Sequence, residues 1–187
     1  HELSVAVNLS TLDLLDELLV DRIARHLERH GLHPHHLTLE ITESSLMVET
    51  PRVMSTINEL DQLGVALALD DFGTGFSSLS YLRQLPVTEL KIDRSFVGNL
   101  LLDEQDEVIV KSTIDLGRNL GLTVVAEGIE SERVSERLRL LGCHLGQGFG
   151  ISRPLPADLF LRWLVTWRVD ERPDDVAPVV ALKALRN

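Results

Sequence analysis

The sequence predicts an α/β protein with the architecture of a TIM-like (β/α)8 barrel, of which about six of the eight strands are present. Six apolar segments alternate with amphipathic segments along the 187 residues, as in repeated units of strand and helix. The apolar segments are continuous enough to be buried on both faces of a parallel sheet. An open doubly wound sheet is the alternative, but it usually carries a glycine fingerprint after its first strand, and none follows residues 5–9. The barrel is therefore favoured.

The first half of the chain begins almost directly with a strand. Residues 3–9 are apolar and partly β-branched, which favours extended backbone. Residues 12–30 repeat leucine and isoleucine at spacings of three and four with charges between them, which predicts an amphipathic helix that Gly31 ends. The alternation continues in the next three expected elements, which are a strand over 37–41, a helix over 51–63 and a strand over 65–69.

The second half resumes the alternation after a glycine-rich loop. Gly121 and Gly142 each separate an expected helix from the strand that follows it. The expected elements are, in order, a short helix over 77–84, a strand over 89–92, a helix over 106–120, a strand over 122–126, a helix over 132–140, a strand over 144–149 and a helix over 157–167. We therefore expect one domain over residues 1–169 and a polar tail over residues 170–187.

The net charge of the chain limits the classes of partner that it can bind. Lysine and arginine number 18 against 29 aspartates and glutamates, so the net charge is −11. This field repels polyanions, which argues against a nucleic-acid polymer as partner and allows an anionic substrate only beside metal ions or a local basic group. The single Cys143 permits no internal disulfide, and no apolar run approaches the roughly 18 to 20 residues that cross a bilayer. We expect a cytoplasmic domain, whose parent protein can be membrane-anchored through an upstream segment.

Every expected strand ends on a polar or ionisable residue. In a parallel barrel, the carboxyl ends of the strands open on one face, where the active sites of such enzymes lie. A single polar strand end is commonly a cap or a turn former, but six in succession indicate a site. These residues are Asn8, Glu40, Asp70 with Asp71, Lys91, Glu127 and Gln147.

The donor set indicates a pair of hard cations. Carboxylate and amide oxygens suit Mg²⁺ or Mn²⁺. Asp70 and Asp71 are adjacent, so both can reach a metal pair if their strand ends between them. Cations would neutralise the repulsion among four carboxylates in one pocket. Two cations about 3.5 to 4 Å apart are a known device for hydrolysing phosphoesters.

Two further features allow more than one interpretation. The loop over 71–78 contains Gly73 and Gly75, which permit close approach of a ligand, but a plain turn between strand and helix explains them equally well. Five histidines lie between residues 26 and 36, around one helix end and a loop. A metal site is conceivable there, and a solvated surface is the simpler interpretation.

Six ordered motifs then match a known family. The sequence resembles the EAL-type cyclic-di-GMP phosphodiesterase domain of bacterial signalling proteins over about Leu3 to Trp167. The matching segments are Val7-Asn8-Leu9-Ser10, Glu40-Ile41-Thr42-Glu43, Asp70 to Ser78, Lys91-Ile92-Asp93-Arg94, Ala126-Glu127-Gly128-Ile129-Glu130 and Gln147-Gly148-Phe149. The resemblance implies a TIM-like barrel that hydrolyses cyclic-di-GMP to linear pGpG with two Mg²⁺ or Mn²⁺ ions and an activated water.

The resemblance also implies roles for individual residues. Asn8, Glu40 and Asp70 would hold one metal, and Asp70 would bridge to a second metal that Asp71 and Glu127 also approach. Glu127 would act as general base or as ligand of the metal-bound water, two roles that the sequence does not separate.

Three more residues receive roles from the same resemblance. Lys91 would orient the nucleophilic water or stabilise developing charge, as a fixed cation can. Gln147 would hydrogen-bond within the site. Glu43 would anchor the loop over 71–78, which the family links to dimerisation and metal occupancy.

One departure from the family concerns its name. The Glu-Ala-Leu motif does not occur in these residues, so we expect it upstream of His1 together with the first two strands of the barrel. We expect weak or no hydrolysis from the isolated chain and activity from the parent protein. Cyclic-di-GMP, a second copy in a homodimer, and an upstream sensor or diguanylate cyclase domain are the expected partners.

Two other functions compete with hydrolysis of cyclic-di-GMP. A degenerate member of the same family would sense cyclic-di-GMP without cleaving it, but such receptors typically lose metal ligands, and all the expected ones are present here. An unrelated barrel enzyme could instead stabilise an enolate with one Mg²⁺, three carboxylates and a lysine base. That alternative gives no reason for the loop after Asp70.

Overall fold

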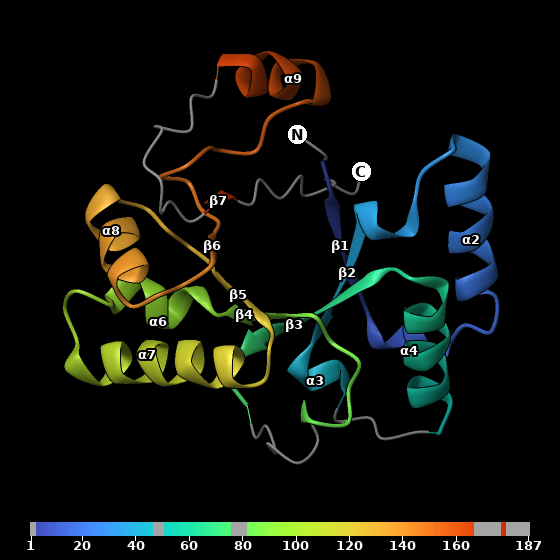
Figure 1. Cartoon of the computed structure of the whole chain (residues 1–187), viewed down its shortest axis with the longest axis horizontal. Coiled ribbons are helices and arrows are strands. Elements are labelled where there is room, and N and C mark those ends of the chain that lie inside the picture. Colours follow the sequence, from blue (N-terminus) through green and yellow to red (C-terminus); the bar gives the residue numbers. More distant parts are fainter. Residues whose placement is uncertain (1–2, 47–50, 76–81, 167–176, 179–187) are drawn as a thin grey trace.

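The computed structural model describes residues 3–46, 51–75, 82–166 and 177–178. One parallel sheet organises these residues, with the strands in the order β1-β2-β3-β4-β5-β6-β7 (Figure 1). The strands are β1 (Val5–Leu9), β2 (Leu37–Thr42), β3 (Ala66–Phe72), β4 (Glu89–Ile92), β5 (Thr123–Ala126), β6 (Leu145–Gly146) and β7 (Ala177–Pro178). Because every neighbouring pair is parallel, all carboxyl ends meet at one edge, and the expected α/β fold of a partial barrel is confirmed.

Helices and one short 3-10 turn (η1) connect the strands. Figure 1 draws α2 and α4 together at the right of the view, and α6, α7 and α8 together at the left. None of the described helices is both long and apolar enough to span a membrane. The elements are α1 (Thr11–Leu15), α2 (Leu19–His30), η1 (Pro34–His36), α3 (Glu43–Leu46), α4 (Pro51–Leu63), α6 (Arg94–Asn99), α7 (Glu104–Asn119), α8 (Glu132–Leu140) and α9 (Ala157–Thr166).

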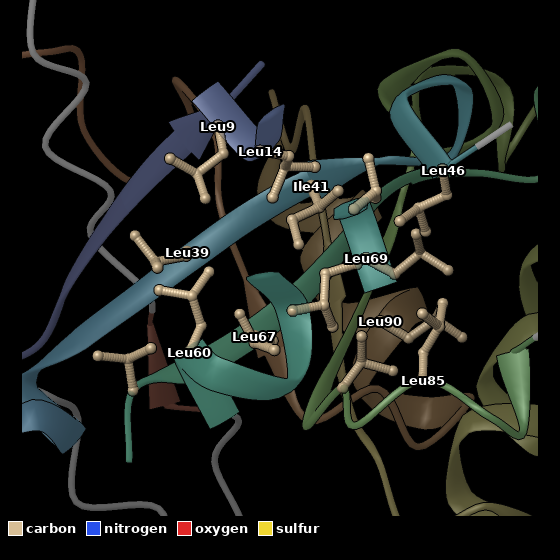
Figure 2. Close-up of a cluster of buried hydrophobic side chains, with 14 of the residues drawn as sticks. Leu9, Leu14, Leu39, Ile41, Leu46, Leu60, Leu67, Leu69, Leu85 and Leu90 are labelled. Atoms are coloured by element: carbon tan, nitrogen blue, oxygen red, sulfur yellow. The ribbon is translucent and has the colours of Figure 1, made fainter. Parts of the chain in front are cut away.

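Alternation along the strands separates an apolar face from a polar one. Successive side chains of a strand point to opposite faces, so Leu39 and Ile41 lie on one face of β2 while Glu40 lies on the other. Leu39 packs in a buried cluster with Leu60 of α4 and Leu67 of β3 (Figure 2). A second buried cluster joins β4 and β5 to α6, α7 and α8. The helices therefore cover one face of the sheet, and the polar residues are left on the other.

The predicted single helix over residues 12–30 is wrong in one respect. The chain leaves the helical conformation at Asp16, which divides α1 from α2. The Asp16 carboxylate accepts a hydrogen bond from the backbone N–H of Leu18 at 2.9 Å and pairs with Arg22 at 2.5 Å. These contacts give polar groups at the start of α2 a nearby partner, so a new helix can begin there. The helix therefore breaks although the apolar spacing continues across the break.

Most other boundaries match the expectations within a few residues, with three exceptions. The expected strand over 144–149 is confined to β6, because after Gly146 the chain turns and Ile129 donates its N–H to the Gln147 carbonyl. The short helices α3 and α6 were not expected. Residues 77–81 of the expected helix over 77–84 lie outside the described residues. So does most of the expected tail, whose residues 177–178 pair with β6 as β7.

Cys143 is a structural thiol. It is buried in the second apolar cluster. Burial raises the pKa of the thiol to about 11. Because the thiolate is the reactive form, a nucleophilic role for Cys143 is disfavoured.

Candidate active site

The polar face of the sheet gathers charged side chains from neighbouring strands. Glu40 lies on β2 and Lys91 on β4, each between two residues whose side chains belong to the apolar clusters on the opposite face. Asp70 lies on β3 and directly follows Leu69 of the first cluster. Glu127 follows β5 directly, and its backbone N–H donates to the Ile92 carbonyl at 3.1 Å. Strand periodicity and the parallel pairing of the strands therefore bring these four residues to one place.

Lys91 is the centre of this group. Its ammonium Nζ lies 2.6 Å from Oε1 of Glu40, 2.6 Å from Oε1 of Glu127 and 3.2 Å from Oδ1 of Asp70. The side chain is only 3% exposed. Burial opposes its charge, but the three carboxylates outweigh burial and raise the pKa of Lys91 well above its usual range. Lys91 is thus a permanent buried cation that ties three strand ends together.

A bulge in β3 lets two adjacent aspartates face this cation. Between the paired positions Leu69↔Leu90 and Phe72↔Ile92, β3 has two residues, Asp70 and Asp71, while β4 has only Lys91. Asp71 is the one non-glycine among the described residues with a left-handed backbone, at φ 57°. The strand does not end between the two aspartates, which was the condition for both to reach a metal pair, because β3 continues to Phe72. The bulge achieves the same result.

Three carboxylates converge closely enough to share a metal ion. One oxygen from each of Asp70, Asp71 and Glu127 lies within 4.8 Å of the other two. Burial raises the pKa of Asp71, and the charges of Asp70 and Asp93 raise it further. Burial also raises the pKa of Glu127, although Lys91 partly offsets the effect. A hard divalent cation would relieve this excess of negative charge, so the residues present fit the Mg²⁺ or Mn²⁺ that the sequence predicts.

The remaining predicted residues surround this group. Asn8 pairs with Glu40 in the register of β1 and β2, which places it on the same face, and its side chain is exposed. The backbone N–H of Gln147 donates to the Ala126 carbonyl at 2.8 Å, next to Glu127. Oε1 of Gln147 is buried and has no hydrogen-bond partner among the described residues. Gln147 therefore offers a buried acceptor on a segment that pairs with the end of β5, next to Glu127 in the sequence.

Glu43 directly follows β2, at the start of α3. It is 5% exposed, and neither carboxylate oxygen has a hydrogen-bond partner within the described ranges. A Cβ atom added to Gly75 would come within 2.8 Å of its Oε1. Glu43 thus lies directly against the loop that follows β3, where the sequence analysis expects it to act as an anchor.

Asp93 is a further site residue, to which its sequence motif alone gives no role. Its charge and a hydrogen bond between the two carboxyl groups both raise the pKa of Asp71. Asp93 also caps α6 by accepting the backbone N–H of Ser95 at 2.9 Å. Its position directly after β4 was the available signal, since polar residues directly after a parallel strand lie at the same edge as the other site residues.

Gly128, next to Glu127, has no space for a side chain. We expect Gly128→Ala to destabilise the chain more than Gly121→Ala. Both glycines have a left-handed backbone conformation, with φ of 72° and 73°. A Cβ at Gly128 would lie 2.5 Å from Cβ of Arg94, whereas nothing lies within 4 Å at Gly121. Left-handed strain costs about 1–2 kcal/mol in both variants, and overlap adds about 1–3 kcal/mol at Gly128. Urea unfolding measures the difference, and equal losses would contradict the close contact with Arg94.

Comparison with known proteins places the chain in a family. Residues 1–154 match the family model described as EAL domain. The chain belongs to the EAL domain family. The bifunctional diguanylate cyclase/cyclic di-GMP phosphodiesterase MucR of Pseudomonas aeruginosa is 47% identical over 158 residues, which make up 84% of this chain and 23% of MucR. This EAL domain chain therefore spans less than a quarter of the length of that relative.

Solved EAL structures share the fold. The c-di-GMP complex of the PaMucR phosphodiesterase matches with a TM-score of 0.80 and 46% identity, covering 84% of this chain and 64% of that chain. The manganese and cyclic-di-GMP complex of BlrP1 from Klebsiella pneumoniae matches with a TM-score of 0.76 and 31% identity, covering 81% of this chain and 39% of that chain. The expected family and its barrel-type fold are therefore confirmed.

Proposed function

We propose that this chain forms part of a cyclic-di-GMP phosphodiesterase that hydrolyses its substrate to linear pGpG. The observation that carries the proposal is the convergence of Asp70, Asp71 and Glu127 around the buried Lys91 at the carboxyl edge of the sheet. The names of the EAL relatives and their complexes with cyclic-di-GMP support the substrate. The manganese in BlrP1 supports a divalent cofactor.

Different residues of this chain would have different roles in the reaction. Two Mg²⁺ or Mn²⁺ ions, when bound, would neutralise the phosphodiester and favour a deprotonated nucleophile. Asn8, Glu40 and Asp70 would hold one ion, with Asp71 and Glu127 around the other. The reaction also needs a general base, a group that stabilises developing negative charge and a hydrogen-bond acceptor.

Glu127, Lys91 and Gln147 would fill these roles. The raised pKa of Glu127 suits a general base, because its carboxylate takes up a proton more readily than an ordinary glutamate does. Lys91 would hold Glu127 in place and stabilise developing negative charge, as its fixed position near three carboxylates allows. Gln147 would accept a hydrogen bond at its buried Oε1, which has no partner among the described residues.

The proposal also covers the organisation of the parent protein. We assign residues 1–169 to the phosphodiesterase domain and residues 170–187 to a polar tail, with the Glu-Ala-Leu strand upstream of His1. The short fraction of MucR that the chain spans supports additional domains, such as a sensor or a cyclase. Glu43 would hold the loop after β3, a second copy would complete a homodimer, and the domain would act in the cytoplasm.

An activity assay tests the proposal. The parent protein is incubated with cyclic-di-GMP and either Mg²⁺ or Mn²⁺, and the products are separated by chromatography. Linear pGpG that forms only with the metal supports the hydrolase. Binding of cyclic-di-GMP without turnover would overturn it in favour of a receptor, and neither binding nor turnover would favour an unrelated one-metal barrel enzyme.

A further inference from the structure

Glu89 is a half-buried glutamate at the start of β4 that the proposed reaction does not use. It lies two residues before Lys91, so its side chain points to the same polar face of the sheet. The residue between them, Leu90, belongs to the first apolar cluster on the opposite face. A further carboxylate therefore lies on the face that carries the acidic site, by which we mean Glu40, Asp70, Asp71 and Glu127 around Lys91.

The strand register places Glu89 level with Glu40. Ala68 of β3 pairs with Glu40 of β2 on one side and with Glu89 of β4 on the other. Neighbouring strands are about 4.8 Å apart, so the backbones of the two glutamates are separated by roughly 10 Å. Between them Ala68 carries only a methyl group, which leaves room for both longer side chains above β3. Ala68 itself is fully buried although it lies on the polar face.

The charges of the acidic site act on Glu89. Burial raises the pKa of its carboxyl group, and the negative charge of Glu40 raises it further. Lys91 and a hydrogen bond with the side chain of Thr38 partly offset these two effects. Thr38 is buried and lies two residues before Glu40 on β2, so it faces the same side of the sheet. Glu89 is thus held by Thr38 at a position where Glu40 repels it and Lys91 attracts it.

A purely structural role does not explain a charge at this position. Because the pKa of Glu89 is raised, its ionised form is less favourable in the folded chain than in the unfolded one. Glutamine would fill the same space and could keep a hydrogen bond with Thr38 without this unfavourable charge. Residues whose charge reduces stability are concentrated at functional sites. A negative charge beside a group of carboxylates does favour one event, which is the binding of a cation.

We infer that Glu89 is a positioning residue of the acidic site, where its negative charge strengthens the binding of the divalent cation. Repulsion from Glu89 directs Glu40 toward the Lys91 ammonium, which lies 2.6 Å from Oε1 of Glu40. Its charge also adds to the negative potential of the three carboxylates that converge at Asp70, Asp71 and Glu127. The inference rests on the proposed function, since it concerns the cation of the same site.

Titration of the metal-depleted chain with Mn²⁺ tests the inference, by isothermal titration calorimetry at a slightly alkaline pH. We expect Glu89→Gln to bind Mn²⁺ about tenfold more weakly than the wild type, the lower range for loss of a group that supports metal ligands. The Tm of metal-depleted Glu89→Gln should equal or exceed that of the wild type, because the unfavourable charge is gone. Glu89→Asp retains the charge and should bind Mn²⁺ more tightly than Glu89→Gln. The matched control is Glu136→Gln, at an exposed position of α8, which should change neither quantity.

Two results would overturn the inference alone. One is equal Mn²⁺ affinity in Glu89→Gln and the wild type, and the other is a Glu89→Gln chain that is unfolded or has a clearly lower Tm, which would make Glu89 a residue that stabilises the fold. A wild type that does not bind Mn²⁺ would overturn both this inference and the metal of the proposed function. Weaker Mn²⁺ binding in Glu89→Gln, together with a parent protein that forms no pGpG, would support the inference and count against the proposed function.

Discussion

Lys91→Met is expected to lower the free energy of unfolding by about 3–5 kcal/mol, the usual cost of removing one partner from a buried charge pair. Methionine retains most of the length of lysine but removes the ammonium that lies 2.6 to 3.2 Å from three carboxylates. Glu40, Asp70 and Glu127 would then repel one another without a compensating charge. For a chain of this size the loss corresponds to a fall in Tm of about 6–20 °C.

Calorimetry of the metal-depleted chain measures the fall in Tm, with Lys111→Met as the matched control. Lys111 is an exposed lysine of α7, so its replacement should change Tm little. The deficit of Lys91→Met should shrink as the pH falls through the range where carboxylates take up protons, because protonation removes the repulsion. It should also shrink in Mn²⁺, which would supply the missing positive charge. A Tm equal to that of the wild type would contradict the central position of Lys91.

Glu127→Gln is expected to reduce the kcat of the parent protein for cyclic-di-GMP by at least about 100-fold, the lower range for loss of a general base. The same variant should keep or raise the Tm of the metal-depleted chain. Burial raises the pKa of Glu127, so its ionised form is less favourable in the folded chain than in the unfolded one. Glutamine removes this unfavourable charge while Lys91 retains Glu40 and Asp70 as partners.

The sign of the pH effect follows from the raised pKa of Glu127. Its cost is present above the folded pKa and disappears as the pH falls below the ordinary range of carboxyl groups. The Tm advantage of Glu127→Gln should therefore be largest near neutral pH and vanish in acid. Glu136→Gln, an exposed position on α8, is the matched control for both activity and Tm. Unchanged kcat in Glu127→Gln would contradict its role, and a large fall in Tm would show that Glu127 mainly stabilises the fold.

Sequence periodicity predicted the structural features that depend on residues close together in the chain. Helix α4 occurs over Pro51–Leu63 as expected, because its apolar spacing and the following Gly64 are local signals. The strand ends that carry Glu40, Asp70, Lys91 and Glu127 also meet as expected, because parallel topology requires it. The division of the first helix was missed because the carboxylate of one residue, Asp16, overrides the pattern.

Features that depend on contacts between distant segments were not predictable. The bulge at Asp70 and Asp71 is defined by the pairing of β3 with β4, which is separated from it by many residues. The three ion pairs of Lys91 require the register of β2, β3, β4 and β5 at once. The part that Asp93 plays beside Asp71 likewise becomes visible only when β4 lies next to the bulge.

The two buried apolar clusters meet at β4, where Leu90 belongs to one cluster and Ile92 to the other. Between them, Lys91 points to the opposite face and binds Glu40 from the first half of the sheet and Glu127 from the second. The charged face therefore links the two clusters, and we expect it to make their unfolding cooperative. Loss of these ion pairs would allow one half to open before the other, which amide hydrogen exchange would detect as two levels of protection.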